Sequence, residues 1–304
     1  MAMVNRRIDQ PTGALRGELV LATIQLSVLR WDPTPAAESG RRAGEGRHIL
    51  YLHGLGSGGV TAWRLAEALA ADGWHVDALD MPGHGGSRWL GADGRPLPDQ
   101  EAVEANLYGL DSMVGILREA IQRLELPVAP ALVGHSWGAA GALAVAATGM
   151  PLERTVLVDP PFASPVQALR LADEIQAELR PDLDSALAEV RTWPEYRDER
   201  DILSRAIALT QVSPHAVQAI CQNVRSWSVL DEADTWRQAR EQSPLEVITG
   251  DAATGSMVGS ADLERLRRLL GSEHVTVLPG ATHSPHRSDF ESFLSALRRA
   301  FLAA

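Results

Sequence analysis

The sequence predicts an α/β protein with a doubly wound, mostly parallel sheet and an inserted helical cap. Short apolar runs that suit buried strands alternate with longer stretches of helical periodicity. This alternation is typical of a parallel sheet covered on both faces. Between about residues 164 and 242 it stops, and apolar positions recur at helical spacing with no intervening strand. The alternation resumes at Leu245, so the helical stretch is interpreted as an insertion.

The elements before the insertion follow in a regular order. Strands are expected at Glu18–Thr23, Gln25–Trp31, His48–Leu52, Trp74–Leu79, Ala131–Gly134 and Thr155–Val158. Helical spacing falls at Thr61–Ala71, Asp99–Leu126 and Trp137–Ala147. The segment Pro33–Gly46 is rich in Pro, Gly, Ala and charge, which indicates an exposed loop.

Prolines mark the insertion, and the α/β pattern follows it. Helices are expected to begin or break at Pro165, Pro181, Pro194 and Pro214. The remaining elements are a strand at Leu245–Thr249, a helix at Ala261–Leu270, a strand at His274–Leu278 and a helix at Asp289–Leu302. The predicted core is therefore residues 1–163 and 244–304, and the predicted cap is residues 164–243, inserted after the sixth strand.

The composition is that of an acidic globular protein. The 304 residues suffice for one large domain or a core with an inserted subdomain, and 45% of them are hydrophobic and 22% charged. A net charge of −11 repels nucleic acid and anionic membranes, so neither is an expected partner. Lysine is absent, which excludes Schiff-base chemistry on a lysine amine and a P-loop.

No targeting or membrane segment is expected. Arg6 and Arg7 are not followed by the apolar run of a secretory signal. The longest small-apolar run, Ala139–Ala147, is too short to span a bilayer. The single cysteine, Cys221, allows no intrachain disulfide and is expected to be a buried thiol rather than a nucleophile. These features predict a soluble, cytoplasmic protein.

The strongest functional signal is Gly134–Gly138, which reads Gly-His-Ser-Trp-Gly. It fits the G-x-S-x-G nucleophile elbow and lies between an apolar strand and a helix of small residues. The sharp turn strains the backbone of Ser136, and the flanking glycines remove side chains that would clash. Free N–H groups at the helix N-terminus can stabilise negative charge near the hydroxyl. The alternative, a chance match to a loose pattern, is disfavoured by this context.

Four motifs together resemble the α/β-hydrolase superfamily in order and spacing. They are His53-Gly54 after one strand, Asp80-Met81-Pro82-Gly83-His84-Gly85-Gly86-Ser87 after the next, the Gly134–Gly138 elbow, and Gly280-Ala281-Thr282-His283 near the C-terminus. The resemblance covers roughly residues 18–163 and 244–302, and the cap matches only as the family's variable helical region. It implies the α/β-hydrolase fold. In such proteins the segment around His84 shapes a loop beside the site and has no catalytic role.

The resemblance implies that Ser136 is the nucleophile and His283 its base. Serine attacks poorly unless a neighbouring imidazole takes its proton. Of nine histidines, His283 stands on the post-strand loop where this fold places its base, and His286 is the alternative. A metal pair of His283 and His286 is disfavoured because no third ligand or zinc motif accompanies it. No metal or organic cofactor is expected.

The backbone N–H groups of Leu55 and Trp137 are the expected oxyanion hole. An acyl-transfer enzyme usually stabilises its tetrahedral oxyanion with two backbone donors. In this family one donor belongs to the residue after the nucleophile, here Trp137, and the other to the earlier strand-to-helix loop, where we favour Leu55. The alternative for that loop is a plain glycine turn.

The acid that orients the imidazole has two candidates. Asp251 follows the strand Leu245–Thr249, the family's commonest location, and is favoured. Its spacing departs from the family, in which the acid more often stands where this chain has Ala253. Asp159, after the strand Thr155–Val158, is the alternative, at a place used by some members, including haloalkane dehalogenases. For either residue, the non-catalytic interpretation is a turn or cap.

Serine at the elbow favours attack on an acyl carbon. Dehalogenases and epoxide hydrolases of the family use an aspartate there to form an alkyl ester, whereas serine suits esters, thioesters, lactones and some carbon–carbon cleavages of diketones. Trp137, Trp193, Trp227 and Trp236 predict either apolar walls for a small hydrophobic substrate or burial of the cap on the core. An ester hydrolase is expected. A C–C bond hydrolase or lactonase, and a non-catalytic ligand-binding protein, are the alternatives.

Overall fold

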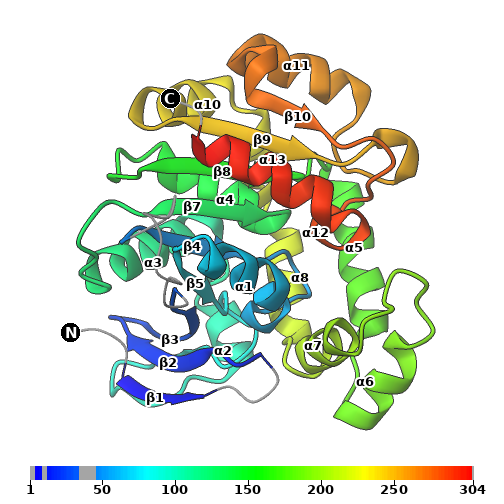
Figure 1. The fold of residues 1–304 in the computed structure, drawn as a ribbon. Coiled ribbons are helices and arrows are strands. Elements are labelled where there is room, and N and C mark those ends of the chain that lie inside the picture. The colour runs from blue at the N-terminus through cyan, green and yellow to red at the C-terminus, as the bar shows by residue number, and fades with distance from the viewer. Residues whose placement is uncertain (1–3, 9–11, 34–45, 303–304) are drawn as a thin grey trace, which may run out of the picture.

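The computed structural model describes residues 4–8, 12–33 and 46–302 and shows one twisted sheet flanked by helices (Figure 1). The strands run in the order β1-β2-β3-β5-β4-β7-β8-β9-β10, with β6 paired to β3. Neighbours from β5 to β10 are parallel, whereas β1, β2, β3 and β5 pair antiparallel. The predicted doubly wound, mostly parallel sheet is confirmed. The strands are β1 (Val4–Ile8), β2 (Leu15–Val20), β3 (Ile24–Trp31), β4 (His48–Leu52), β5 (His75–Leu79), β6 (Arg88–Trp89), β7 (Ala131–His135), β8 (Arg154–Val158), β9 (Leu245–Thr249) and β10 (Val275–Val277).

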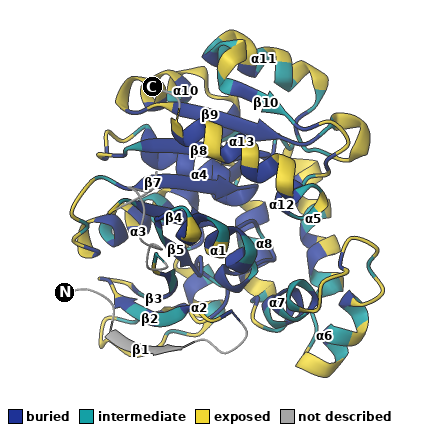
Figure 2. Cartoon of the chain, viewed as in Figure 1, coloured by how far each residue is buried: buried dark blue, intermediate teal, exposed yellow. Residues whose placement is uncertain are grey.

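Helices cover both faces, so β4, β7, β8 and β9 are buried at every position (Figure 2). Alternate residues of β4 enter opposite cores, as expected for side chains on a pleated strand. Leu50 and Leu52 pack with α3 and α4, whereas Ile49 and Tyr51 pack with α1 and α13. The core helices are α1 (Trp63–Ala71), α2 (Asp99–Glu104), α3 (Leu110–Arg123), α4 (Trp137–Ala146), α11 (Ser260–Leu270), α12 (Pro285–Ser288) and α13 (Phe290–Leu302).

The helical insertion follows β8. Its helices are α5 (Pro165–Glu178), α6 (Leu183–Val190), α7 (Glu199–Thr210), α8 (Pro214–Gln222), α9 (Arg225–Ser228) and α10 (Ala233–Gln242). α5 contacts α8, and α6 and α7 share a small apolar core of their own. By contrast, α10 packs against α4 and α11. The predicted cap range of 164–243 therefore includes α9 and α10, which both pack against the core helix α4.

Other details of the fold differ from the prediction. β1 and β6 are additional strands, so the insertion follows the eighth strand rather than the sixth. β6 has only two residues and owes its geometry to pairing with β3, which leaves no periodic signal. Residues 99–126 form two helices instead of one, because Asn106 has a φ of 55° and Gly109 is extended. The predicted loop Pro33–Gly46 lies mostly outside the described residues.

Candidate active site

Ser136 occupies a sharp turn between β7 and α4, at the carboxyl end of the sheet. Its backbone has φ 52° and ψ −124°, a conformation that only tight surroundings maintain. A Cβ on Gly134 would lie 2.3 Å from the Gly138 carbonyl oxygen, and one on Gly138 would lie 2.4 Å from that of Leu52. Both glycines are therefore required by close backbone packing, as the elbow motif predicts.

His283 lies on the loop after β10 and joins two side chains that are distant in sequence. Its Nε2 is 2.9 Å from Ser136 Oγ, and its Nδ1 is 2.6 Å from Asp159 Oδ2. With Nδ1–H donating to the carboxylate, Nε2 is left to accept the serine proton. This is the relay geometry of a nucleophile, its base and an orienting acid.

Asp159 is fully buried and heavily hydrogen-bonded. It follows β8 with a φ of 44°, and its Oδ1 accepts hydrogen bonds from Thr249 Oγ1 at 2.6 Å and from the Gly250 N–H at 2.8 Å. Ser256 Oγ donates to the same oxygen at 2.6 Å, and the Met257 N–H donates to Oδ2 at 2.9 Å. These donors fix the carboxylate against His283.

The same contacts keep Asp159 ionised. Burial by itself would raise the pKa of the carboxyl group, but hydrogen bonding from His283 and the attraction of its ring, together with the Ser256 and Thr249 hydroxyls, lower the pKa below its ordinary value. A charged carboxylate therefore faces the imidazole at neutral pH and can offset the positive charge that the ring gains when it accepts a proton.

The preference for Asp251 over Asp159 does not fit the structure. Asp251 is partly exposed, and its carboxylate accepts hydrogen bonds from the N–H groups of Ala253 and Gly280 at 2.9 and 3.1 Å. It caps a short helical turn and braces the base of the loop that carries His283. The backbone at Gly250 packs closely against this loop, since a Cβ on Gly250 would lie 2.3 Å from the Thr282 carbonyl oxygen.

The segments that carry the two predicted oxyanion donors both adjoin Ser136. The loop after β4 passes close to it, because a Cβ on Gly54 would lie 3.1 Å from Ser136 Cβ. Trp137 is the first residue of α4. Within the described residues, neither Leu55 nor Trp137 uses its N–H in a hydrogen bond. Both donors therefore remain available for a charge that develops beside the serine.

The motif around Asp80 holds the oxyanion loop, which we define as residues 53–59. Asp80 accepts hydrogen bonds from the Gly59 and Gly86 N–H groups at 2.8 and 2.9 Å and pairs with Arg16 at 3.0 Å. Burial would raise the pKa of Asp80, but the Arg16 charge and the Gly86 N–H outweigh it and keep the pKa low. His84 Nε2 accepts from the Gly56 N–H at 3.2 Å, so this motif shapes the loop.

Four buried histidines surround the site as neutral rings. Burial lowers the pKa of His53, and it lowers the pKa values of His84 and His135 to about 3. His286, the alternative base, has a pKa well below normal for the same reason, and both its ring nitrogens lack a partner in the described structure. A ring packed this way against His135 cannot take the place of His283 beside the serine.

Acidification is expected to destabilise the protein through these rings. Above the unfolded histidine pKa of about 6.5 their stabilising contribution is complete, and below it the unfolded chain binds protons that the folded chain does not. The free energy of unfolding should fall by up to about 1.4 kcal/mol per pH unit for each histidine. Urea titrations between about pH 7 and pH 5 measure this slope. His286→Leu should lower the slope of unfolding free energy against pH by the contribution of one histidine. It should also raise stability at neutral pH, because two unpaired ring nitrogens are removed. An unchanged slope would contradict the account.

The cap tryptophans are mainly packing residues. Trp227 and Trp236 are each 1% exposed and donate hydrogen bonds to the backbone oxygens of Ile220 and Leu230. Trp137 is also buried. Trp193 is more exposed than Trp137, Trp227 and Trp236, and the guanidinium group of Arg205 lies over its ring. The interpretation that these side chains bury the cap therefore holds for Trp227 and Trp236.

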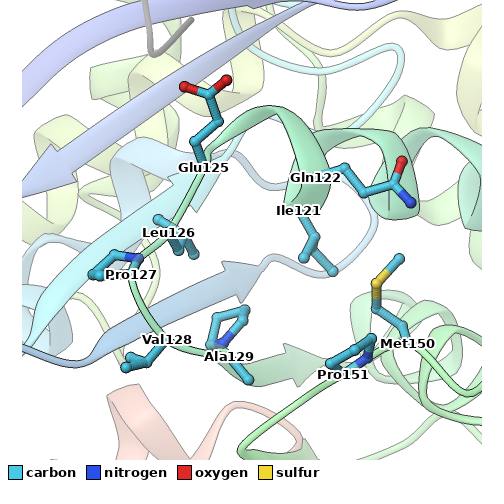
Figure 3. Close-up of a pocket in the computed structure, with 10 residues that line it drawn as sticks. Ile121, Gln122, Glu125, Leu126, Pro127, Val128, Ala129, Met150 and Pro151 are labelled. Atoms are coloured by element: carbon cyan, nitrogen blue, oxygen red, sulfur yellow. The ribbon is translucent and has the colours of Figure 1, made fainter.

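A surface pocket of about 450 Å³ lies away from this site (Figure 3). Its lining is mostly apolar and comes from the end of α3 and the segments that lead into β7 and β8. Ser136 lies at the opposite end of β7, so this pocket is not part of the catalytic arrangement. The lining residues are Ile121, Gln122, Glu125, Leu126, Pro127, Val128, Ala129, Pro130, Met150 and Pro151.

Metal-binding clusters and membrane-spanning helices are both absent from the part of the chain that the structure describes. In residues 4–8, 12–33 and 46–302, no three His, Cys, Asp or Glu side chains gather as a metal-binding group. Over the same residues, no helix combines the length and apolar character that crossing a bilayer requires. Cys221 is buried, and burial raises the pKa of its thiol to about 12, which fits a packing role.

The fold, the elbow serine and the histidine on the last strand's loop together define an α/β-hydrolase. Residues 49–296 match the Alpha/beta hydrolase family, and the chain belongs to that family. No curated protein matches the chain in sequence.

Solved structures with the same fold act on different bonds. The chain is similar to E-2-(acetamidomethylene)succinate hydrolase, with a TM-score of 0.73, 20% identity, and 95% of this chain and 100% of that one covered. It is also similar to the thioesterase domain from the curacin biosynthetic pathway, with a TM-score of 0.66, 20% identity, and coverage of 95% and 99%. Potato (Solanum tuberosum) epoxide hydrolase I has a TM-score of 0.63, 13% identity, and coverage of 93% and 98%. At these identities the likeness establishes the fold alone.

Proposed function

We propose that the protein is a serine hydrolase that cleaves an ester-type bond of a small hydrophobic substrate through an acyl-enzyme. The supporting observation is the pair of hydrogen bonds that link Ser136 to His283 at 2.9 Å and His283 to Asp159 at 2.6 Å. In this proposal Asp159, and not Asp251, is the acid of the triad.

The proposed reaction proceeds in two steps. His283 Nε2 takes the hydroxyl proton as Ser136 Oγ attacks the substrate carbonyl carbon, while the N–H groups of Leu55 and Trp137 donate to the developing oxyanion. The tetrahedral intermediate collapses, and His283 returns the proton to the leaving group. A water molecule then loses a proton to His283 and attacks the acyl-enzyme, and the proton passes back to Ser136 as the acid leaves. Asp159 keeps the ring in the required tautomer throughout.

A serine nucleophile limits the kinds of bond that the proposed enzyme can cleave. The structural neighbours include a thioesterase and an epoxide hydrolase by name, so the fold does not select the bond. A serine oxygen suits attack on an acyl carbon. Ile175, an apolar residue of α5, approaches Gly56 of the oxyanion loop and suits a hydrophobic acyl group nearby.

A substrate panel tests the proposal. Short-chain p-nitrophenyl esters, an acyl thioester, an aliphatic lactone and a vinylogous diketone should be compared for the unmodified protein and Ser136→Ala. Turnover of the esters, thioester or lactone that disappears in the variant is the expected result. Activity confined to the diketone would indicate a C–C bond hydrolase. No reaction with any compound, by a folded protein, would favour a ligand-binding role.

A further inference from the structure

A buried arginine of the cap contacts the oxyanion loop directly. Arg205 lies on α7 and is 9% exposed. Its Nη1 donates to the Gly56 carbonyl oxygen at 2.6 Å, and its Nη2 pairs with Glu178 of α5 at 2.7 Å. The guanidinium lies over Trp193, 5.3 Å from the ring centroid. Two cap helices and one core loop therefore meet at this side chain.

Gly56 is held from two sides. Its N–H donates to His84 in the core, and its carbonyl accepts from Arg205 in the cap. Its φ of 72° and the approach of Ile175, 2.9 Å from where a Cβ would stand, leave the residue no space for a side chain. Arg205 thus fixes the Gly56–Ser57 peptide, whose Ser57 N–H donates to the Gly54 carbonyl oxygen at 3.2 Å. That carbonyl belongs to the same peptide as the Leu55 N–H, so the direction of the Leu55 N–H is fixed as well.

The buried position of Arg205 also lowers the stability of the fold. Its Nε is buried and finds no acceptor within the described residues. Leaving a buried donor unpaired destabilises a fold, and the two Nη contacts must offset this loss of stability. What its geometry does achieve is a charge-assisted hydrogen bond to one carbonyl oxygen, which is stronger than a neutral one.

We propose that Arg205 is a positioning residue that fixes the oxyanion loop from the cap, so that the Leu55 N–H is aimed at the transition-state oxyanion only when the cap is seated. The inference rests on the proposed function. Arg205 acts through Gly56 and touches no reacting atom. Its loss should therefore weaken binding of the transition state more than binding of the substrate.

Arg205→Met tests this proposal, because methionine preserves much of the apolar stem and removes the donors. The control is Arg180→Met, since Arg180 is another cap arginine that pairs with a glutamate, Glu189, at 2.7 Å and has no hydrogen bond to the oxyanion loop. With p-nitrophenyl acetate, kcat of Arg205→Met should fall about 10- to 100-fold while KM changes less than about threefold. The control should stay within about twofold of the unmodified protein.

A transition-state analogue gives a second readout that general loosening would not reproduce. An aryl trifluoromethyl ketone forms a hemiketal oxyanion with the serine, and its Ki in Arg205→Met should rise by the same factor by which kcat/KM falls. Added guanidinium ion should restore part of the activity of Arg205→Met and none in the control. Arg205→Lys, with one compact ammonium for two partners, should fall between the Met variant and the unmodified protein.

The outcomes separate this inference from the proposed function. If the unmodified protein shows no Ser136-dependent turnover, both fail. If it turns over and Arg205→Met matches Arg180→Met in kcat and in ketone affinity, only the positioning role is overturned. Should the Met variant not fold, Arg205→Lys decides: a folded Lys variant with unaltered kcat and Ki overturns the role, and parallel losses in both support it.

Discussion

Ser136→Ala is expected to lower kcat for the preferred ester by on the order of 10⁴-fold or more. The hydroxyl is the attacking group, and without it the remaining contacts can only assist direct hydrolysis by water. The fold should survive, because the variant removes one oxygen from a side chain that is 5% exposed and whose hydrogen-bond partner, His283, is partly solvated. Steady-state kinetics with a thermal melt measure both quantities.

Ser164→Ala is the matched control for this prediction. Ser164 is an exposed serine that caps α5 through Gln167, so its loss should cost about 1 kcal/mol of stability and leave kcat within about twofold. A Ser136→Ala protein that retains more than a few per cent of the turnover would show that another group attacks the substrate.

Asp159→Asn is expected to reduce kcat by about 10²- to 10⁴-fold, whereas Asp251→Asn should stay within about twofold. Asparagine keeps the size of the side chain but removes the charge, so it no longer favours the imidazolium and can hold the ring in the wrong tautomer. The Asp251 carboxylate accepts the Ala253 N–H at Oδ1 and the Gly280 N–H at Oδ2. Asparagine can keep one of these hydrogen bonds, and the one that is lost does not involve Ser136 or His283. The two variants should be measured side by side at neutral pH.

If Asp159 is not the acid, the results expected for Asp159→Asn and Asp251→Asn are reversed. Collapse of activity in Asp251→Asn with full activity in Asp159→Asn would restore Asp251 as the acid. Because Asp159 also receives bonds from Thr249 and Ser256, its variant needs a melting curve to separate lost stability from lost catalysis.

The proposed nucleophile and base, Ser136 and His283, could be selected from the sequence because their signals are local. The strand, the turn and the small-residue helix around Ser136 lie within sixteen consecutive positions, residues 131–146, and steric packing of the elbow glycines explains the motif. His283 follows a strand in a short motif. Short apolar runs alternate with helical stretches along the sequence, so the parallel part of the sheet was predictable as well.

The proposed acid, Asp159, could not be selected by the same reasoning, because non-local contacts hold it against His283. Asp159 and Asp251 both follow a buried strand. Their places in the sequence do not show which carboxylate reaches His283. The donors that fix Asp159 come from positions 249–257, about ninety residues on, and its positive φ turns the side chain toward them. The hydroxyl residues Thr249, at the end of β9, and Ser256, in the loop that follows, are the sequence signal for this carboxylate.

The cap shows the same limit. Its helices were predicted from periodicity and proline spacing, but no motif distinguishes Arg205 from the other arginines of the insertion. Its role depends on α7 meeting the oxyanion loop 149 positions earlier in the sequence. Likewise, α10 has ordinary amphipathic spacing. Only its packing against α4 shows that it belongs with the core helices.

The central claim is that Ser136 is activated by His283 and Asp159, and covalent labelling tests it most directly. A fluorophosphonate should modify the protein once per chain, on the peptide that contains Ser136, as located by mass spectrometry. We expect His283→Ala to slow this labelling by at least about 100-fold, because the hydroxyl loses its base. Labelling at another residue, or an unchanged rate on Ser136 in folded His283→Ala, would contradict the account.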